Sequence, residues 1–264
     1  MESISALGDI DCPEEGEEAK KGRVVFDHVS FSYGDGGEVL TDISFVIEKG
    51  KTLGIIGGTG SGKSTIVNLM MRFYDPKKGR VYIEGKDARR YRLPDLRRKF
   101  GVVFQNDFIF HDTILSNIKI GRDIDDEAVR KAARDSEASA FIEEYSDGYL
   151  HEAAIHGSSF SGGQKQRILI ARALAGASPV VILDDSSSAL DYRTDREVRK
   201  NILSSHKDSS LVIVAQRVSS VMSADEIIYL KEGRIAGKGC HSFLLENCPE
   251  YREIWETQMG ESLE

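Results

Sequence analysis

The amino-acid sequence predicts an α/β fold with a parallel sheet at its core, an antiparallel β subdomain on the N-terminal side and an inserted α-helical subdomain. Residues 53–57, 180–183 and 211–215 are short, continuous apolar runs typical of strands buried on both faces, and helical patterns separate them. Residues 24–33 and 39–50 instead alternate apolar and polar side chains, as half-buried antiparallel strands do. Buried strands that alternate with helices indicate a parallel sheet.

The composition is that of a globular protein: 264 residues, 40% hydrophobic and 30% charged. The formal net charge of −8 argues against a general nucleic-acid binder, although it leaves room for a local basic site for a phosphorylated ligand. The cysteines Cys12, Cys240 and Cys248 form no C-x-x-C pair, which favours unpaired thiols in a reducing compartment. Because the sequence contains neither a secretory signal nor an apolar run near the ~18 residues of a membrane span, action at a membrane would need a partner or a further segment.

Three segments divide the chain. Residues 1–22 are rich in acidic residues, lack apolar periodicity and are predicted to be a linker. Residues 23–258 are predicted to form the folded domain, and residues 259–264 a tail. From about residue 107 to 160 the sequence shows Asp-, Glu- and Ala-rich helical patterns and few strand candidates. We expect several short helices there and place the helical subdomain at about 107–175.

A glycine-rich motif ends the first buried run. Residues 57–64 read G-G-T-G-S-G-K-S, which matches the phosphate-loop pattern G-x-x-x-x-G-K-[ST]. The glycines let the backbone curl until its N–H groups face one point, and a helix start adds partial positive charge there. Lys63 is expected to reach the β- and γ-phosphates, and Ser64 to offer an oxygen to Mg²⁺. The predicted nucleotide ligands of this motif are Gly57, Gly58, Thr59, Gly60, Ser61, Gly62, Lys63, Ser64 and Thr65. The helix expected next repeats apolar residues at helical spacing, namely Ile66, Leu69, Met70 and Phe73.

Two adjacent carboxylates, Asp184 and Asp185, follow the second buried run. Paired negative charges at the end of a buried strand repel each other and need a positive partner nearby. The phosphate loop supplies that partner, since a P-loop enzyme holds its Mg²⁺ with an aspartate at such a strand end. Asp184 is therefore predicted to act on the metal through a water, and Asp185 to contact the attacking water. The alternative for Asp185 is that it caps the segment that follows.

A second anion-binding end is predicted in residues 160–174, F-S-G-G-Q-K-Q-R-I-L-I-A-R-A-L. Ser161 is an expected N-cap, and Gly162 and Gly163 expose backbone N–H groups at a helix start. This stretch closely resembles the L-S-G-G-Q signature of the nucleotide-binding domain of ATP-binding-cassette (ABC) transporters. The resemblance covers about residues 23 to 258 and includes several motifs in the family's order.

The resemblance implies cofactors, partners and further site residues. Tyr33 matches the aromatic that stacks on adenine, although it could instead be an ordinary strand tyrosine. Gln105 matches the glutamine that contacts Mg²⁺ or water and senses the membrane domain, and Asp191 ends the loop that crosses to the other subunit. Two such domains pair head to tail and hold ATP and Mg²⁺ between the phosphate loop of one and the signature of the other. The signature residues are Ser161, Gly162, Gly163 and Gln164.

The flanking segments resemble the exporter branch of the family. Residues 1–22 look like the connector after a last membrane helix, and residues 237–258 look like the exporter tail. The resemblance therefore implies an attached transmembrane domain, with this chain on the cytoplasmic face of the membrane. The transported substrate depends on membrane helices that these residues do not include.

Three positions depart from the family pattern. Asp185 stands where competent members carry glutamate, which places the carboxylate roughly 1.5 Å short. Gln216 stands where the family has histidine, and an amide carries neither a proton nor a charge to the γ-phosphate. Ala154 and Ile155 replace a Gly-Glu pair before the signature, which puts in doubt the contact that usually couples this domain to the membrane domain. The catalytic positions Asp185, Gln216 and Gln105 thus predict a degenerate site in one half of a heterodimeric exporter.

Two alternatives accompany this hypothesis. One is a slow homodimeric ATPase, and the other is a regulatory module that binds ATP without hydrolysis. Soluble cassette proteins of DNA repair or chromosome organisation are disfavoured, because they need coiled-coil or zinc insertions and the sequence shows neither heptads nor C-x-x-C.

Overall fold

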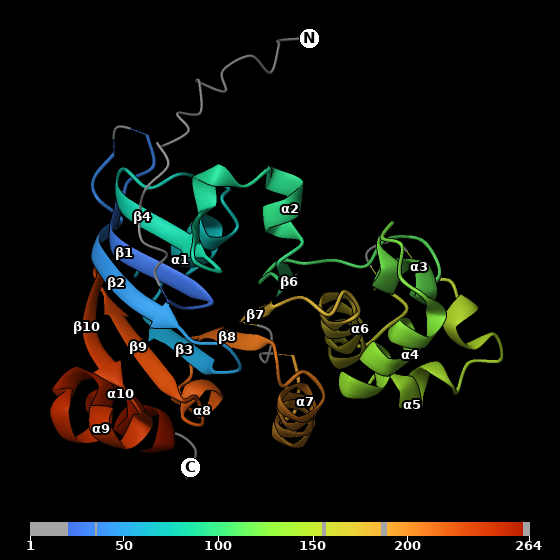
Figure 1. Cartoon of the computed structure of the whole chain (residues 1–264). Helices are drawn as coiled ribbons and strands as arrows, with labels where there is room; N and C mark the ends of the chain where they lie inside the picture. Colours follow the sequence, from blue (N-terminus) through green and yellow to red (C-terminus); the bar gives the residue numbers. More distant parts are fainter. Residues whose placement is uncertain (1–20, 35, 155–156, 186–188, 261–264) are drawn as a thin grey trace.

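The computed structural model describes residues 21–34, 36–154, 157–185 and 189–260. Figure 1 shows two sheets stacked on one side of the molecule, and a group of helices on the other side, joined to the sheets through α6. The linker expected at 1–22 therefore lies almost entirely outside the described residues, and so does most of the tail expected at 259–264.

The larger sheet has six strands in the order β10-β9-β3-β8-β7-β6. All neighbouring pairs are parallel except β9 and β10, which form an antiparallel hairpin at one edge. The three apolar runs that predicted buried strands are β3, β7 and β8, and they lie side by side in the middle of this sheet. Its strands are β3 (Thr52–Gly57), β6 (Phe100–Val103), β7 (Val180–Asp184), β8 (Ser210–Ala215), β9 (Glu226–Lys231) and β10 (Arg234–Gly239).

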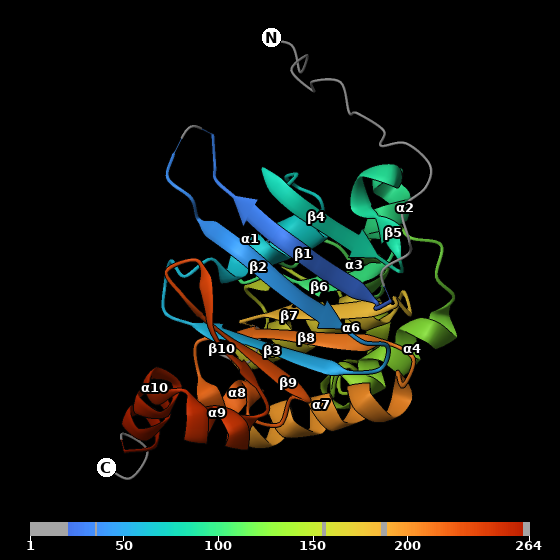
Figure 2. The same cartoon turned by 60° about the vertical axis from the view of Figure 1, so that its left-hand side comes forward.

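The smaller sheet is antiparallel, with the order β2-β1-β4-β5. Its first two strands are the predicted alternating segments, and they pair Phe26 with Phe45, whose rings stack at 4.5 Å between centroids. Figure 2 shows this sheet above the larger one, with strand directions that differ between the two layers. Its strands are β1 (Val24–Phe31), β2 (Leu40–Ile47), β4 (Lys78–Ile83) and β5 (Lys86–Asp87).

Two hydrophobic cores cover the two faces of the larger sheet. Along β7, Val180 and Ile182 contribute to one core while Val181 and Leu183 contribute to the other, as the two-residue period of a strand requires. One core includes β1, β2 and α1 (Lys63–Met70), and the other includes α6 (Gly162–Leu174) and helices on the opposite face. Burial on both faces explains why these strands read as continuous apolar runs.

The chain between β6 and β7 contains several helices. They are α3 (Ile114–Lys119), α4 (Asp126–Asp135), α5 (Ser139–Ile142), the short helix η2 (Gly148–Leu150) and α6. Among the described residues of this stretch the structure has no strand of either sheet, and a single bridge joins Thr113 to Glu152. The short helices expected from the acidic, alanine-rich pattern are therefore present.

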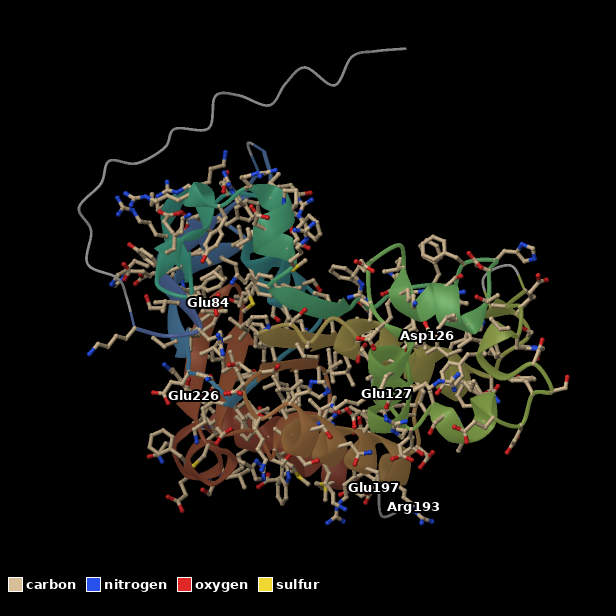
Figure 3. The ribbon with its side chains drawn as sticks, turned by 45° about the vertical axis from the view of Figure 1, so that its right-hand side comes forward. Glu84, Asp126, Glu127, Arg193, Glu197 and Glu226 are labelled. Atoms are coloured by element: carbon tan, nitrogen blue, oxygen red, sulfur yellow. The ribbon has the colours of Figure 1, made fainter. Side chains whose placement is uncertain are left out.

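The end of α4 joins these helices to the α/β core. There Asp135 accepts a hydrogen bond of 3.0 Å from Ser205 of α7 (Tyr192–Ser205), and its other oxygen lies 3.0 Å from His206 Nε2. Figure 3 shows Glu127 at the start of α4 and Glu197 on α7 on the same side of the molecule. The remaining helices are η1 (Ala88–Arg90), α2 (Leu93–Arg97), α8 (Val218–Val221), α9 (His241–Asn247) and α10 (Pro249–Gly260).

The apolar pattern after the phosphate loop overestimates the length of the helix that follows it. α1 ends at Met70, because Arg72 adopts a left-handed φ of 50° and its guanidinium pairs with Asp75 at 2.9 Å. Phe73, expected on the buried helix face, lies beyond the helix and is 43% exposed. It faces Arg97 instead, with the guanidinium 4.9 Å from the ring centroid.

No helix among the described residues has the length and apolar character needed to cross a membrane.

Candidate functional site

The predicted phosphate loop joins β3 to α1 and folds as a tight turn over the start of that helix. Gly60 and Gly62 both have positive φ, at 76° and 102°. At Gly62 the position of a side chain is already taken, because a Cβ there would lie 2.5 Å from Leu40 Cδ2. Glycine is therefore required at this position for both backbone conformation and space, which explains why the motif keeps it next to Lys63.

Lys63 is held inside the loop that precedes it. Its Nζ donates hydrogen bonds of 2.7 Å to the Gly57 carbonyl and 2.8 Å to the Gly58 carbonyl. Burial lowers the pKa of this ammonium, while the carboxylates of Asp184 and Asp185 act in the opposite direction. A positive charge is thus fixed at the mouth of the loop, between the backbone turn and the two aspartates.

Asp184 is the last residue of β7 and only 5% of it is exposed. Burial, together with the neighbouring charge of Asp185, raises the pKa of its carboxyl to about 6, although Lys63 and a hydrogen bond from Ser64 act to lower it. The cost of burying this charge is therefore compensated only in part by the chain's own cation. A carboxylate held in this way favours a further cation beside it.

These groups line one small pocket of about 150 Å³ at the carboxyl ends of the parallel strands. Gln105 reaches it from the segment after β6, and Gln216 from the segment after β8. Ligands of α/β proteins bind at such strand ends, so this position is the one expected for the phosphate end of a nucleotide. The lining residues are Thr59, Gly60, Lys63, Ser64, Gln105, Asp184, Asp185, Val214, Ala215 and Gln216.

Asp185 leaves the strand in a left-handed conformation, with φ of 49°. Its N–H donates to the Val214 carbonyl at 2.8 Å, so the bend of the chain is tied to the neighbouring strand. The direction of the Asp185 side chain therefore depends on this bend rather than on simple strand alternation. The alternative role of Asp185 is to cap the segment that follows it, and residues 186–188 of that segment lie outside the described residues.

The residues present fit Mg²⁺ bound to a polyphosphate. Ser64, Gln105 and Asp184 bring a hydroxyl, an amide and a carboxylate to one pocket, and magnesium prefers such oxygen ligands. The backbone of the loop is open at Gly58 and Gly60, where an added Cβ would meet nothing within 4 Å. Backbone N–H groups, the Lys63 ammonium and the buried Asp184 thus form a site for an anion and a cation together.

Five of the predicted loop ligands do not line this pocket, namely Gly57, Gly58, Ser61, Gly62 and Thr65. The Ser61 hydroxyl is buried and has no hydrogen-bond partner in the described part of the chain. The Thr65 hydroxyl lies 3.1 Å from the Tyr33 hydroxyl instead. Gly57 accepts from Lys63 through its carbonyl. These residues shape the loop and its surroundings.

Tyr33 lies just beyond the end of β1, so it is not a strand residue. Its hydroxyl contacts Thr65 of α1, and its ring meets Phe31 and Tyr74 edge to face, at 4.8 and 5.1 Å between centroids. The side chain is fixed on three sides and 41% of the residue remains exposed. A fixed, partly exposed ring beside the phosphate-loop helix is suited to stacking on a base.

The signature residues lie at the start of α6, and none of them lines the pocket around Lys63. Ser161 is the N-cap as predicted: its Oγ accepts from the Gln164 N–H at 3.2 Å, while its own N–H donates to the Gln164 side chain at 2.8 Å. This capping box fixes the first turn. Gly162 and Gly163 follow, with Ala189 against both of them. Within one copy of the chain the two anion-binding ends therefore do not meet.

Sequence reasoning missed two side chains that hold the site from outside. Arg172 of α6 donates to the Phe108 carbonyl at 3.0 Å and to the Asn117 carbonyl at 2.9 Å, which ties α6 to the segment after Gln105. Gln258 of α10 contacts the segment that carries Gln216. Both residues lie in segments that the sequence analysis identified, 160–174 and the tail that ends at 258, but neither pattern indicates these contacts. The expected contact residue Ile155 lies outside the described residues.

Comparison with known proteins gives a consistent result. A sequence model described as ABC transporter matches residues 40–188. An ATP-dependent lipid A-core flippase from Sodalis glossinidius is 40% identical over 247 residues, which cover 92% of this chain and 42% of the relative. ATP-binding cassette sub-family B member 6 of Homo sapiens is 37% identical over 243 residues, which cover 92% of this chain and 29% of the relative.

A solved structure is similar as well. It is described as a bacterial Atm1-family ABC exporter with ATP bound, and it matches with a TM-score of 0.86 and 36% sequence identity. The match covers 91% of this chain and 42% of that chain. The present chain thus spans less than half the length of these relatives.

Proposed function

Because the chain belongs to the ABC transporter family, we propose that it binds and hydrolyses ATP with Mg²⁺ as the motor domain of an exporter. The observation that carries this proposal is the pocket that brings Lys63, Ser64 and Asp184 together at the carboxyl ends of parallel strands. The relatives are an ATP-dependent flippase and an exporter with ATP bound, which supports the same nucleotide.

Each group has a separate task in this proposal. The loop N–H groups and Lys63 neutralise the β- and γ-phosphates, and Tyr33 holds the base. Ser64, Asp184 and Gln105 would hold the metal, which would supply positive charge against the negative charge of the phosphates. Asp185 and Gln216 face the same pocket and are placed to orient the water that attacks the γ-phosphate.

A second nucleotide-binding domain is the proposed partner. The signature residues are exposed or half-buried at the start of α6 and do not reach the Lys63 pocket of their own chain. A helix start with free N–H groups binds anions, so Ser161, Gly162 and Gly163 would complete the site of a facing copy or relative. ATP held between two domains in this way would drive their closure.

A transmembrane domain is the other proposed partner. These relatives are more than twice as long as this chain, and they are described as a lipid A-core flippase and an ABC exporter. Phe104, Phe108 and Phe110 are exposed aromatic residues on the segment that follows Gln105, and Phe108 and Phe110 pack edge to face at 4.8 Å. Exposed apolar patches favour a protein partner. We propose that this segment faces the membrane domain, which places the chain on the cytoplasmic side.

Degeneracy of the site is part of the proposal. Asp185 is shorter than the usual glutamate, and Gln216 lacks the charge of a histidine. Both side chains that would activate the attacking water are therefore weaker than the usual ones. Because the signature of this chain is nearly complete, it would still serve the competent site of a heterodimer partner. A slow homodimer and a regulatory module without hydrolysis are the alternatives, and the same two residues motivate them.

Calorimetric titration with Mg-ATP tests the proposal. The chain should bind, and Lys63→Ala should lose affinity at least about tenfold, because one charge-assisted contact with the phosphates is removed. Lys51→Ala is the matched control, since Lys51 pairs with Asp225 at 3.0 Å and does not line the pocket. The proposal is overturned if the unmodified chain does not bind Mg-ATP, or if both variants lose affinity equally.

A further inference from the structure

We infer that Gln258, near the end of α10, is a positioning residue for Gln216: its amide fixes the backbone that carries Gln216 into the nucleotide pocket. Gln258 Nε2 donates to the Gln216 carbonyl at 3.0 Å, and Gln258 Oε1 accepts from the Val218 N–H at 2.8 Å. A primary amide offers a donor and an acceptor at once, so a single side chain makes both contacts. The inference rests on the proposed nucleotide function.

The contact matters because this segment lacks local support. α8 begins at Val218, and its N-cap residue Arg217 makes no side-chain cap. The first N–H groups of a helix have no partner inside the helix and need one from elsewhere. Gln258, which lies 40 residues further along the chain than Val218, supplies that acceptor. The start of α8 is therefore capped by the C-terminal helix rather than by its own sequence.

The helix that carries Gln258 is itself firmly placed. Tyr251 of α10 is fully buried, and its hydroxyl lies 2.8 Å from His241 Nδ1 at the start of α9. Ile254 and Trp255 pack against the larger hydrophobic core. Gln258 thus projects from a fixed element, and its amide transmits the position of α10 to the segment at 216–218.

The far end of α8 is held independently. Arg199 of α7 donates to the Ser220 carbonyl and also pairs with Asp195 at 2.9 Å. Loss of the Gln258 amide should therefore free the end of α8 next to Gln216 without releasing the whole helix. A local change of this kind alters one wall of the pocket, because Gln216 lines it together with Lys63 and Asp185.

The expected consequence is selective for the third phosphate. The base and the first phosphates would contact Tyr33 and the loop, which Gln258 does not touch, whereas Gln216 is placed toward the γ-phosphate. Gln258→Ala should weaken binding of a non-hydrolysable Mg-ATP analogue about three- to tenfold and leave Mg-ADP affinity within about twofold. Gln258→Glu should act in the same direction, because a carboxylate still accepts from Val218 but cannot donate to the Gln216 carbonyl.

The experiment measures both affinities by calorimetry on the full chain, with Thr257→Ala as control. Thr257 lies on the same helix, and its hydroxyl donates to the Glu253 carbonyl of that helix at 2.8 Å. Equal weakening for both nucleotides, or no change in either Gln258 variant, overturns the inference. If the unmodified chain binds neither nucleotide, the proposed function fails and so does this role of Gln258.

Amide hydrogen exchange separates the two failures without nucleotide. The N–H of Val218 should exchange faster in Gln258→Ala than in the unmodified chain or in Thr257→Ala, because its acceptor is removed. Unchanged exchange at Val218 would show that Gln258 does not hold this segment, whatever the chain binds.

Discussion

Asp184 combines burial with a position between one cation and one further carboxylate, and this combination gives it an unusual dependence on pH. Its carboxyl is stabilised in the protonated form, so the folded state binds the proton more tightly than the unfolded chain does. Ionisation of Asp184 therefore lowers the free energy of unfolding at high pH. This destabilisation grows as the pH rises from about 4, the pKa of the carboxyl in the unfolded chain, to about 6, its pKa in the folded chain.

Asp184→Asn should remove this cost. Relative to the unmodified chain, the variant is expected to gain about 1–3 kcal/mol more in unfolding free energy at pH 8 than at pH 4. Urea denaturation without nucleotide at the two pH values measures it. Asp225→Asn is a control of opposite sign, because the pKa of Asp225 is lowered: burial raises it, but hydrogen bonds from Thr52 and Lys51 outweigh that effect. If the difference in unfolding free energy between Asp184→Asn and the unmodified chain is the same at pH 4 and pH 8, the prediction is contradicted.

Asp185 and Gln216 carry the degeneracy hypothesis. The double variant Asp185→Glu with Gln216→His should raise ATP turnover at least about tenfold, because it lengthens the carboxylate and restores a group that can carry a proton. Steady-state phosphate release measures this, and Lys63→Ala in the restored background should abolish the gain. If turnover does not rise in the restored variant, the regulatory-module alternative is favoured instead.

At the scale of elements, α6 has two roles that meet at Ser161. The capping box engages the N–H groups of Ser161 and Gln164, and the N–H groups of Gly162 and Gly163 between them are the proposed anion site for a facing domain. A side chain that caps the helix also orients the N–H groups that follow it. Local stability and partner binding are thus linked at one residue.

Ser161→Ala should lower the unfolding free energy by about 1 kcal/mol and also weaken ATP-dependent association of two domains. Asp125→Ala is the matched control, since Asp125 caps α4 through a 2.7 Å bond from the Ala128 N–H and is remote from the signature. Both variants should lose similar stability, but only Ser161→Ala should lose association, as measured by light scattering with Mg-ATP. Equal association in the two variants would argue against a signature role for Ser161.

At the scale of the whole molecule, buried polar contacts join α6 to α3 and to the segment that follows β6. Arg172 makes several of these contacts, with bonds to Asn117, Phe108 and Asp107, and it also faces the ring of Phe110. Burial lowers the pKa of its guanidinium, and Asp107 opposes that effect. The network links the signature helix to the segment after Gln105, so displacement of one should displace the other.

Arg172→Met should lower the unfolding free energy by about 3–5 kcal/mol, because it leaves the buried partners of the guanidinium unsatisfied. Arg134→Met is the control: Arg134 pairs with Glu127 at 2.9 Å on the surface, and such pairs contribute about 0–1 kcal/mol. Urea denaturation of both variants measures the difference. Similar losses in the two variants would mean that the Arg172 network does not carry the connection.

Sequence patterns were sufficient where the physics is local. The apolar runs identified β3, β7 and β8, because a strand buried on both faces leaves no room for polar residues. The phosphate loop was recognised because its glycines and lysine act within a few residues of one another, and Ser161 because an N-cap bonds to its own helix. These features depend on backbone geometry over one or two turns, so a single sequence contains all that determines them.

Tertiary structure alone decided which distant residues meet. The extent of α1 was overestimated at Phe73, because the chain bends at Arg72 to place its guanidinium beside Asp75. Gln258 and Arg172 show no signal in the sequence, since a glutamine or an arginine in a helix is ordinary until its partner is known. Their hydrogen bonds span 42 and 55 residues, and bonds of that separation form only when packing of the cores has already brought the elements together.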